Sequence, residues 1–306
     1  MKENHISLRS RNISWLVKSL FHPRIYTMCL FLPMVLAPLI FDLRWYWFVL
    51  LSCFVLLSIF ELSSMLMNSL QQLVTFDGVA HHKKRCYLPH QFWQVCLMIT
   101  CFILYSLLAF SPEQIPFYCV IFFLWFTVFN LFLAGNTREA LNRIFVSITC
   151  VIFACLPWLA PWLIFELDRG HEYMIFVIAV VMGSDTGGLL TGKLFGHHQM
   201  APQISPNKTW EGALGAILVA TIVAGLYAFV TGLFSPWQAL ILSLIGSIAS
   251  MTGDLLISVM KRFATVKDTG SLFPGHGGFL DRGDGFIVAT PILWLIMEYM
   301  MISGLV

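Results

Sequence analysis

The chain consists mainly of long apolar runs separated by short polar segments. A helix needs about 20 apolar residues to cross the hydrocarbon core of a bilayer, and nine runs approach or exceed that length. The first run is short and contains Pro33 and Pro38, so we expect it to tilt, kink or re-enter the membrane. The pattern predicts an all-α polytopic integral membrane protein with about nine transmembrane helices. They lie near 26–41, 45–67, 92–110, 115–134, 144–165, 173–190, 212–234, 237–260 and 286–305.

The composition indicates that lipid is the solvent for most of this chain. Of the 306 residues, 58% are hydrophobic and only 11% are charged, whereas a soluble domain carries about 25% charged residues. Most of the eight cysteines lie inside apolar runs and none forms a CxxC pair, which favours buried, reduced thiols over a disulfide framework. Membrane lipids are therefore expected partners, and no nucleic-acid partner is expected.

The basic residues are distributed unequally between alternate polar segments. Of the 18 lysines and arginines, only Arg44 and Arg169 lie outside the N-terminal tail and every second loop after it. Because lysine and arginine accumulate on the cytoplasmic side, this asymmetry predicts a cytoplasmic N-terminus and an external C-terminus. We divide the chain into a basic tail at 1–25, N-terminal helices at 26–165 and a catalytic region at 173–306. The two glycine-rich loops of that region, 191–211 and 261–285, then face the cytoplasm.

Several acids lie at one level of the predicted membrane. Glu61, Asp185 and Asp254 fall towards the cytoplasmic ends of their apolar runs, where an unpaired charge is costly. Asp281 and Asp284 are three residues apart, so in a helix their side chains share a face. Converging carboxylates repel one another, and hard oxygen ligands are those that Mg²⁺ prefers. The sequence therefore predicts a Mg²⁺ site made by Asp254, Asp281 and Asp284, with Asp185 either a further ligand or the cap of a helix break.

Cations and glycines surround these acids in the sequence. Backbone amides at Gly275, Gly277 and Gly278 can approach an anion closely, although glycines also simply make turns. Asn207, Lys208 and Thr209 precede the run that starts near residue 212, where the first amides of a helix would face a phosphate. Acids for a metal and bases for phosphates favour phosphoryl or nucleotidyl transfer onto a lipid phosphate. The positive charge comes from Lys208, Lys261, Arg262, Lys267 and Arg282, although Lys261 and Arg262 alone also fit an ordinary membrane anchor.

The run from Ser258 to Asp284, SVMKRFATVKDTGSLFPGHGGFLDRGD, resembles the signature of the phosphatidate cytidylyltransferases. The block at 185–212 resembles that family's other cytoplasmic segment. The resemblance implies that phosphatidic acid attacks the α-phosphorus of CTP at a Mg²⁺ centre, giving CDP-diacylglycerol and pyrophosphate. It also implies a homodimer in a bacterial inner membrane, and it leaves His276 either to orient a phosphate or to transfer a proton. Besides the five cations, it assigns substrate binding to Asn207, Ser258, Asp268, Gly277 and Gly278.

Four positions depart from the family pattern. Gly283 replaces an apolar residue or threonine, Gly188–Leu189 replaces alanine and tyrosine, and Lys193 stands where arginine is common. These departures suggest a divergent paralogue and leave the lipid acceptor open. A CTP-dependent polyprenol or lipid kinase, in which an alcohol attacks the γ-phosphorus, is the alternative enzyme. A transporter is a third reading, but it would place its polar residues near the bilayer midplane.

Overall fold

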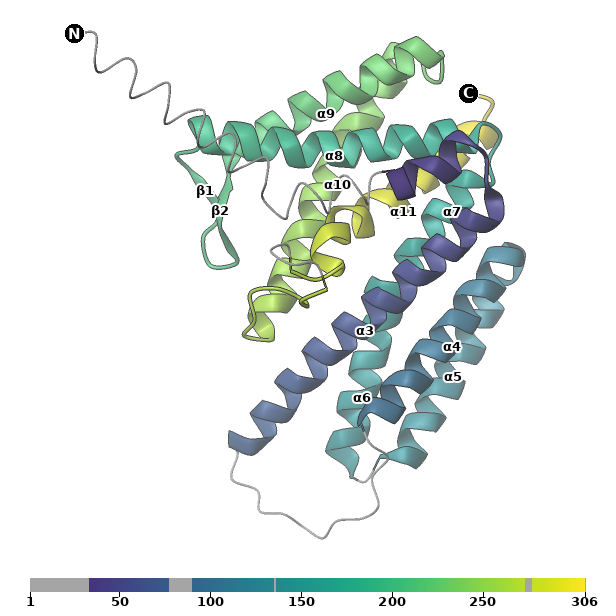
Figure 1. Ribbon diagram of the computed structural model, residues 1–306, viewed down its shortest axis with the longest axis vertical. Helices are drawn as coiled ribbons and strands as arrows, with labels where there is room; N and C mark the ends of the chain where they lie inside the picture. Colours follow the sequence, from purple (N-terminus) through teal and green to yellow (C-terminus); the bar gives the residue numbers. More distant parts are fainter. Residues whose placement is uncertain (1–32, 77–89, 135, 273–276, 306) are drawn as a thin grey trace, which may run out of the picture.

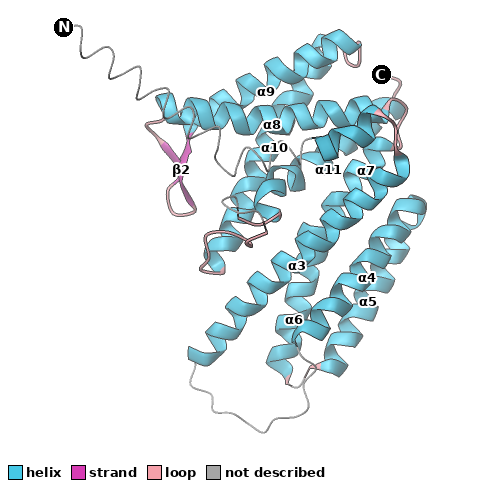
Figure 2. Cartoon of the chain, viewed as in Figure 1, coloured by secondary structure: helices cyan, strands magenta, loops and turns pink. Residues whose placement is uncertain are grey.

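A computed structural model describes residues 33–76, 90–134, 136–272 and 277–305, and these segments are almost entirely helical (Figures 1 and 2). One two-stranded antiparallel hairpin, β1–β2, is the only sheet within these segments. A short helix covers 33–40. The other α-helices are α3 (Arg44–Phe76), α4 (His90–Phe110), α5 (Ile115–Leu133), α6 (Thr137–Cys150), α7 (Leu159–Phe165), α8 (Gly170–Phe195), α9 (Trp210–Thr231), α10 (Pro236–Phe263) and α11 (Leu280–Ile302).

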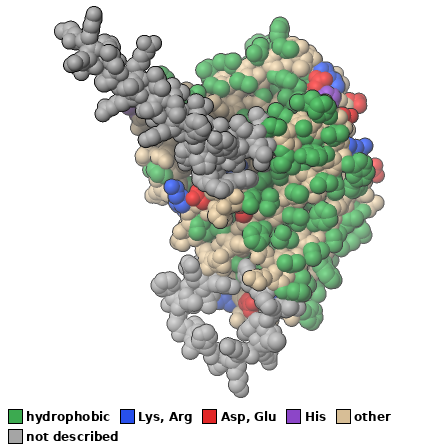
Figure 3. Space-filling view, in the orientation of Figure 1, with side chains coloured by type: hydrophobic (Ala, Val, Ile, Leu, Met, Phe, Trp, Pro, Cys, Tyr) green, Lys and Arg blue, Asp and Glu red, His purple; other side chains and the backbone are tan. Residues whose placement is uncertain are grey.

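The described segments contain seven helical stretches long and apolar enough to cross a membrane, and α5 contributes a shorter apolar helix. Large hydrophobic side chains are exposed along most of them, and Figure 3 shows a broad apolar band on one face. A folded chain tolerates so much exposed apolar surface when lipid covers it. The predicted all-α polytopic membrane protein is confirmed. The count of nine spans and the orientation of the termini stay predictions, and residues 26–32 of the first predicted run lie outside the described residues.

Three expectations from the sequence differ from the helices that the chain forms. The run at 144–165 is not one regular helix, because a π-helical turn (Val151–Cys155) and a 3₁₀ turn (Leu156–Trp158) separate α6 from α7. Pro157 lacks an N–H, which prevents a continuous α-helical ladder at this point. The expectation that Asp185 caps a helix break is wrong, since α8 continues through it to Phe195. The LDRGDG sequence was expected in a loop but forms the first turns of α11.

Helices α8 and α9 lie side by side (Figure 1) and pack through small residues. A side chain on Gly187 would meet the Gly215 carbonyl oxygen at 2.4 Å, so this glycine is needed for the close approach. A stripe of buried alanines continues the contact along α9, from Ala216 to Ala228. Small residues let membrane helices gain van der Waals contact where lipid provides no hydrophobic drive. The α8–α9 pair thereby forms a firm support for the hairpin that joins them.

Helix α3 connects the two halves of the chain. It packs on α4, α6 and α7 and also reaches α10 and α11. Its buried face includes Trp47, Val55, Ile59 and Leu62, each at most 1% exposed. The polar residue Glu61 lies among them and is only 4% exposed. A carboxylate in this position needs hydrogen-bond donors from its neighbours.

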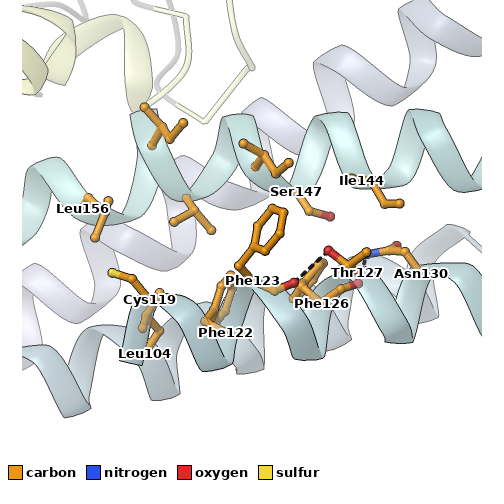
Figure 4. Close-up of a pocket in the computed structure, with 13 residues that line it drawn as sticks. Leu104, Cys119, Phe122, Phe123, Phe126, Thr127, Asn130, Ile144, Ser147 and Leu156 are labelled. Atoms are coloured by element: carbon orange, nitrogen blue, oxygen red, sulfur yellow. Dashed lines mark hydrogen bonds between the residues drawn. The ribbon is translucent and has the colours of Figure 1, made fainter. Parts of the chain in front are cut away.

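A cavity of about 210 Å³ lies in the N-terminal half, between α4, α5 and the segment formed by α6 and the π-helical turn (Figure 4). Its walls are apolar, with Phe122, Phe123 and Phe126 on one side and Ile144 and Leu156 on the other. None of the residues predicted to bind substrate or metal lines it. The chemistry predicted from the sequence therefore has to be sought elsewhere in the structure.

Candidate active site

The hairpin β1 (Gln199–Ala201) and β2 (Ser205–Thr209) lies beside the ends of α8, α9 and α10 (Figure 1). Thr209 ends the hairpin and caps α9, since its hydroxyl oxygen accepts a hydrogen bond from the Gly212 amide at 3.1 Å. At the turn, the Arg262 Nε donates to the Ile204 carbonyl at 3.1 Å, which ties the hairpin to the end of α10. The hairpin is therefore held over the polar end of the helices.

Three of the four predicted metal-binding acids interact at this end. The Lys208 ammonium of β2 contacts the Asp254 carboxylate of α10 at 3.1 Å, and both side chains are about one quarter exposed. The Asp284 side chain of α11 interacts electrostatically with Asp254. Asp185 of α8 interacts electrostatically with Asp254 and with the cations Lys208 and Arg282. Four elements thus contribute to one mixed cluster of acids and bases.

Glycine allows α10 and α11 to approach where these acids meet. A side chain on Gly253 would come within 2.3 Å of the Asp284 carbonyl oxygen, and one on Gly285 would meet the Ser250 hydroxyl at 2.6 Å. Both glycines are immediate neighbours of the interacting acids. The short contact between the helix backbones therefore places Asp254 and Asp284 within reach of each other.

Asp281, the fourth predicted ligand, is bound by protein donors. Its Oδ1 accepts a hydrogen bond of 2.6 Å from the Lys261 ammonium, and the Asp281 side chain is 4% exposed. Its Oδ2 accepts from the amides of Thr269 and Gly278 at 2.8 and 3.0 Å and from the Thr269 hydroxyl at 3.0 Å. Both oxygens are thus engaged within the chain. The predicted metal-binding role of Asp281 stays a prediction, but its present contacts are structural.

A second buried carboxylate reaches the same turn from a distant part of the sequence. Glu61 of α3 accepts hydrogen bonds from the amides of Phe279 and Leu280 at 2.7 and 2.9 Å. The Thr269 hydroxyl contacts it at 2.9 Å. The sequence marks Glu61 as an acid in an apolar run but does not indicate its partner, because more than 200 residues separate it from α11.

The two described glycines of HGGFLD, Gly277 and Gly278, make close contacts within the protein, and their predicted substrate-binding role stays a prediction. Gly277 adopts φ +81°, which favours glycine, and the Gly278 amide donates to Asp281 rather than to a ligand. A side chain on Gly278 would meet Glu61 and Thr269 oxygens at 2.3 Å. The turn does bring amides to an anion, but that anion belongs to the protein. Gly275 and His276 lie outside the described residues.

Gly283 packs on an aromatic ring from the N-terminal half. A side chain at this position would meet two ring carbons of Trp158 at 2.9 Å. The Trp158 indole N–H donates to the Ser58 hydroxyl at 2.9 Å, and its ring also packs on Phe54 and Phe279. The glycine that departs from the family pattern is therefore matched by a bulky neighbour. Packing explains this departure without any change in the charged groups.

The remaining predicted residues lie around the same end of the molecule. Ser258 is half-buried on α10, while Asn207 in β2 is exposed, as are Lys267 and Asp268 after α10. Arg282 is exposed on the first turn of α11. Across the described ranges, no three His, Cys, Asp or Glu side chains converge closely enough to form a ready metal-binding group. Residues 187–194, GGLLTGKL, fit the GxxxxGK part of a phosphate-binding loop motif, but they lie inside α8, which rules out such a loop there.

The fold and cluster define a polytopic membrane protein with a polar site at one end of its C-terminal helices. The model of the family described as "Cytidylyltransferase family" matches residues 22–300. The chain belongs to this family.

Named relatives agree with that assignment. A phosphatidate cytidylyltransferase of Bacillus subtilis is 34% identical over 190 residues, which are 61% of this chain and 68% of the relative. One from Mycobacterium leprae is 36% identical over 160 residues, or 52% of this chain and 50% of the relative. One from Staphylococcus aureus is 42% identical over 132 residues, or 42% of this chain and 50% of the relative. The chain thus matches between half and about two thirds of the length of these relatives.

The two lysine–aspartate pairs are expected to differ in their contribution to stability. In Lys261→Met, Asp281 loses the cation that compensates its buried charge, so the free energy of unfolding should fall by about 3–5 kcal/mol. In Lys208→Met, the partly exposed Asp254 remains solvated, and the loss should be about 1 kcal/mol or less. Thermal unfolding of the two purified variants provides the comparison. Equal losses would contradict the structural role assigned to the Lys261–Asp281 pair.

Overpacking against Trp158 is also testable. Gly283→Val places new methyl groups against the ring, so the free energy of unfolding should fall by about 1–3 kcal/mol. Trp158→Leu in the same chain should recover part of that loss, because it opens space next to residue 283. Gly225→Ala in α9 is the matched control, since a side chain there meets nothing within 4 Å. Denaturation midpoints are compared for wild type, Gly283→Val, the double variant with Trp158→Leu, and Gly225→Ala. A wild-type midpoint for Gly283→Val would contradict the packing role of this glycine.

Proposed function

We propose that this protein transfers the cytidylyl group of CTP to phosphatidic acid, forming CDP-diacylglycerol and pyrophosphate. The observation that carries the proposal is the cluster of Asp185, Asp254 and Asp284 with Lys208 and Arg282 at one end of the membrane helices. Such a cluster has acids for a cation and bases for phosphates. The names of the relatives, phosphatidate cytidylyltransferases, support the same substrates.

The reaction needs alignment and charge neutralisation more than covalent help from the protein. A phosphate oxygen of the lipid forms a bond to the α-phosphorus of CTP, and the bond from that phosphorus to the β-phosphate bridging oxygen breaks. Negative charge then increases on the leaving pyrophosphate. Preorganised cations stabilise this charge because they need no reorganisation when it develops.

Mg²⁺ is part of the proposal, and the donor chemistry of the cluster fits it. The Asp254 and Asp284 carboxylates repel each other, and a bound cation would relieve that repulsion. Hard oxygen ligands of this kind suit Mg²⁺. Asp254 and Asp284, with Asp185 beside them, would hold it, and it would neutralise phosphate charge when bound. Asp281 is a weaker candidate because both of its oxygens already have donors.

The basic side chains differ in how free they are to bind substrate phosphates. Lys208 is a quarter exposed and contacts only one oxygen of Asp254, so it can turn to a phosphate entering the cluster. Arg262 uses Nε to hold the hairpin while its side chain remains exposed. Lys261 is committed to a buried carboxylate and is better suited to maintaining the fold. We assign phosphate binding chiefly to Lys208, Arg262, Lys267 and Arg282.

We extend the proposal to the cellular setting. The distribution of basic residues supports a cytoplasmic N-terminus and a site that faces the cytoplasm, where CTP is made. The relatives from bacteria support the inner membrane as its location. A homodimer, as the family resemblance implies, belongs to the same proposal.

The central assay uses purified protein, phosphatidic acid, Mg²⁺ and CTP labelled at the α-phosphate. Label should enter the lipid and unlabelled pyrophosphate should be released. Asp254→Asn should lower turnover by about 100-fold or more, because it removes charge from the proposed metal site. Asp42→Asn is the matched control. Asp42 is exposed and is more than 140 residues away from the cluster in the sequence, and asparagine readily adopts its positive φ of 49°.

Each other outcome of this assay has a definite meaning. Transfer of label from γ-labelled CTP to a lipid alcohol would identify a kinase instead. Full turnover in folded Asp254→Asn would remove the cluster as the active site. Activity that is independent of added Mg²⁺ and insensitive to chelator would contradict the metal.

Orientation is tested by fusions to alkaline phosphatase, which is active only after export from a bacterial cytoplasm. A fusion after residue 306 should be active, because the C-terminus is expected outside. A truncated fusion after Val266 should be inactive, since that loop is expected inside. The reverse pattern would place the site on the external face and contradict access to cytoplasmic CTP.

A further inference from the structure

Helix α11 begins without a cap of its own. The residue at its N-cap position, Phe279, has helical dihedral angles and no side-chain hydrogen bond to the first turn. The first amides of a helix have no partners within it, and they are costly to bury without acceptors. The acceptors come instead from outside the helix. Glu61 of α3 receives the Phe279 and Leu280 amides, one on each carboxylate oxygen.

The carboxyl group of Glu61 is surrounded by hydrogen-bond donors. Its side chain is buried, so its oxygens need donors from the protein. Two amides, the Thr269 hydroxyl and the positive end of the α11 dipole meet that need. The Thr269 hydroxyl oxygen lies 2.9 Å from a Glu61 oxygen and 3.0 Å from an Asp281 oxygen, so the two acids compete for its single proton. The two buried carboxylates therefore form one hydrogen-bonded unit around the start of α11.

The turn held in this way also carries the charged groups of the site. Asp281, Arg282 and Asp284 all lie in the first two turns of α11. Glu61 holds the turn from one side, and the Trp158 ring packs against Phe279 and Gly283. If the first turn rotated, Asp284 would move relative to Asp254 on α10. A displacement of about 1 Å at a catalytic group can cost about 100-fold in rate.

We propose that Glu61 is a positioning residue: it caps α11 from α3 and thereby sets where Asp284 and Arg282 stand relative to Asp254. It touches no substrate in this proposal. Its effect on turnover rests on the proposed cytidylyl transfer, but its effect on the start of α11 does not. The two effects can be measured separately.

Glu61→Gln is the sharpest variant because it changes shape very little. The three bonds of Glu61 use both oxygens as acceptors. In glutamine, whichever way the amide is turned, an NH₂ group faces at least one backbone N–H and loses that bond. Glu298→Gln, the same substitution on an acid further along α11, is the matched control.

The kinetic test measures thermal stability, kcat, and KM for CTP and Mg²⁺ in both variants. In folded Glu61→Gln, kcat should fall about 10- to 100-fold and the Mg²⁺ requirement should rise, because Asp284 no longer stands correctly against Asp254. Glu298→Gln should match wild type. A purely structural role would lower stability and the active fraction but leave both KM values unchanged, and that result would overturn the proposal.

The second test needs no activity. Hydrogen–deuterium exchange of a peptide spanning 277–285 should become about tenfold faster in Glu61→Gln, since the capped amides lose acceptors. A peptide from 240–250 of α10 should be unchanged. If the wild-type protein transfers no cytidylyl group, the proposed function fails while this measurement still decides the capping role. Unaltered exchange at 277–285 would overturn that role.

A third variant keeps the proposal testable if Glu61→Gln does not fold. Thr269→Val removes only the hydroxyl that joins Glu61 to Asp281 and retains the Thr269 backbone amide. Exchange at 277–285 should rise about threefold to tenfold, since one hydrogen bond of the unit is lost. If both single variants and the double variant fold, the effects of Glu61→Gln and Thr269→Val on kcat should be less than additive. Full additivity, or wild-type exchange in Thr269→Val, would contradict a shared unit.

Discussion

The site depends on the burial of two carboxylates against the unsatisfied amides at the start of α11. Glu61 approaches from α3 and Asp281 lies in the helix itself, and between them they accept from three backbone N–H groups of the turn. Carboxyl groups as buried as those of Glu61 and Asp281 need such hydrogen-bond donors. Because the amides and the acids satisfy each other, the turn has one stable arrangement. Helices α3, α10 and α11 meet in that arrangement, with Lys261 contributing the compensating cation.

The acids near the site thus divide into two groups with different tasks. Glu61 and Asp281 are almost fully buried and bound to protein donors, so they maintain structure. Asp185, Asp254 and Asp284 interact electrostatically with one another and with cations, and few of their oxygens are engaged by protein donors. Residue type does not distinguish the groups. Burial and the supply of donors do.

Close approach of the helices is achieved by small residues on one side and a large aromatic ring on the other. Gly187 and Gly253 allow backbones to touch, whereas Trp158 fills the space above Gly283. Trp158 takes its position from an irregular segment, where a π turn and Pro157 interrupt the helix. The N-terminal helices therefore contribute to the site through packing and one hydrogen-bonding acid, although their sequences carry little of the family signature.

The apolar periodicity and composition of the sequence determined the class of protein, because lipid-crossing helices must satisfy their own backbone and expose apolar side chains. The motif with Lys261, Asp281 and Asp284 indicated the region of the chemistry, since charge at membrane depth is rare. Which acids remain available, and which are consumed by the fold, was decided only by tertiary structure. Glu61 illustrates the reason. Its partners lie more than 200 residues away in the sequence, and a local sequence pattern cannot predict a contact between such distant residues.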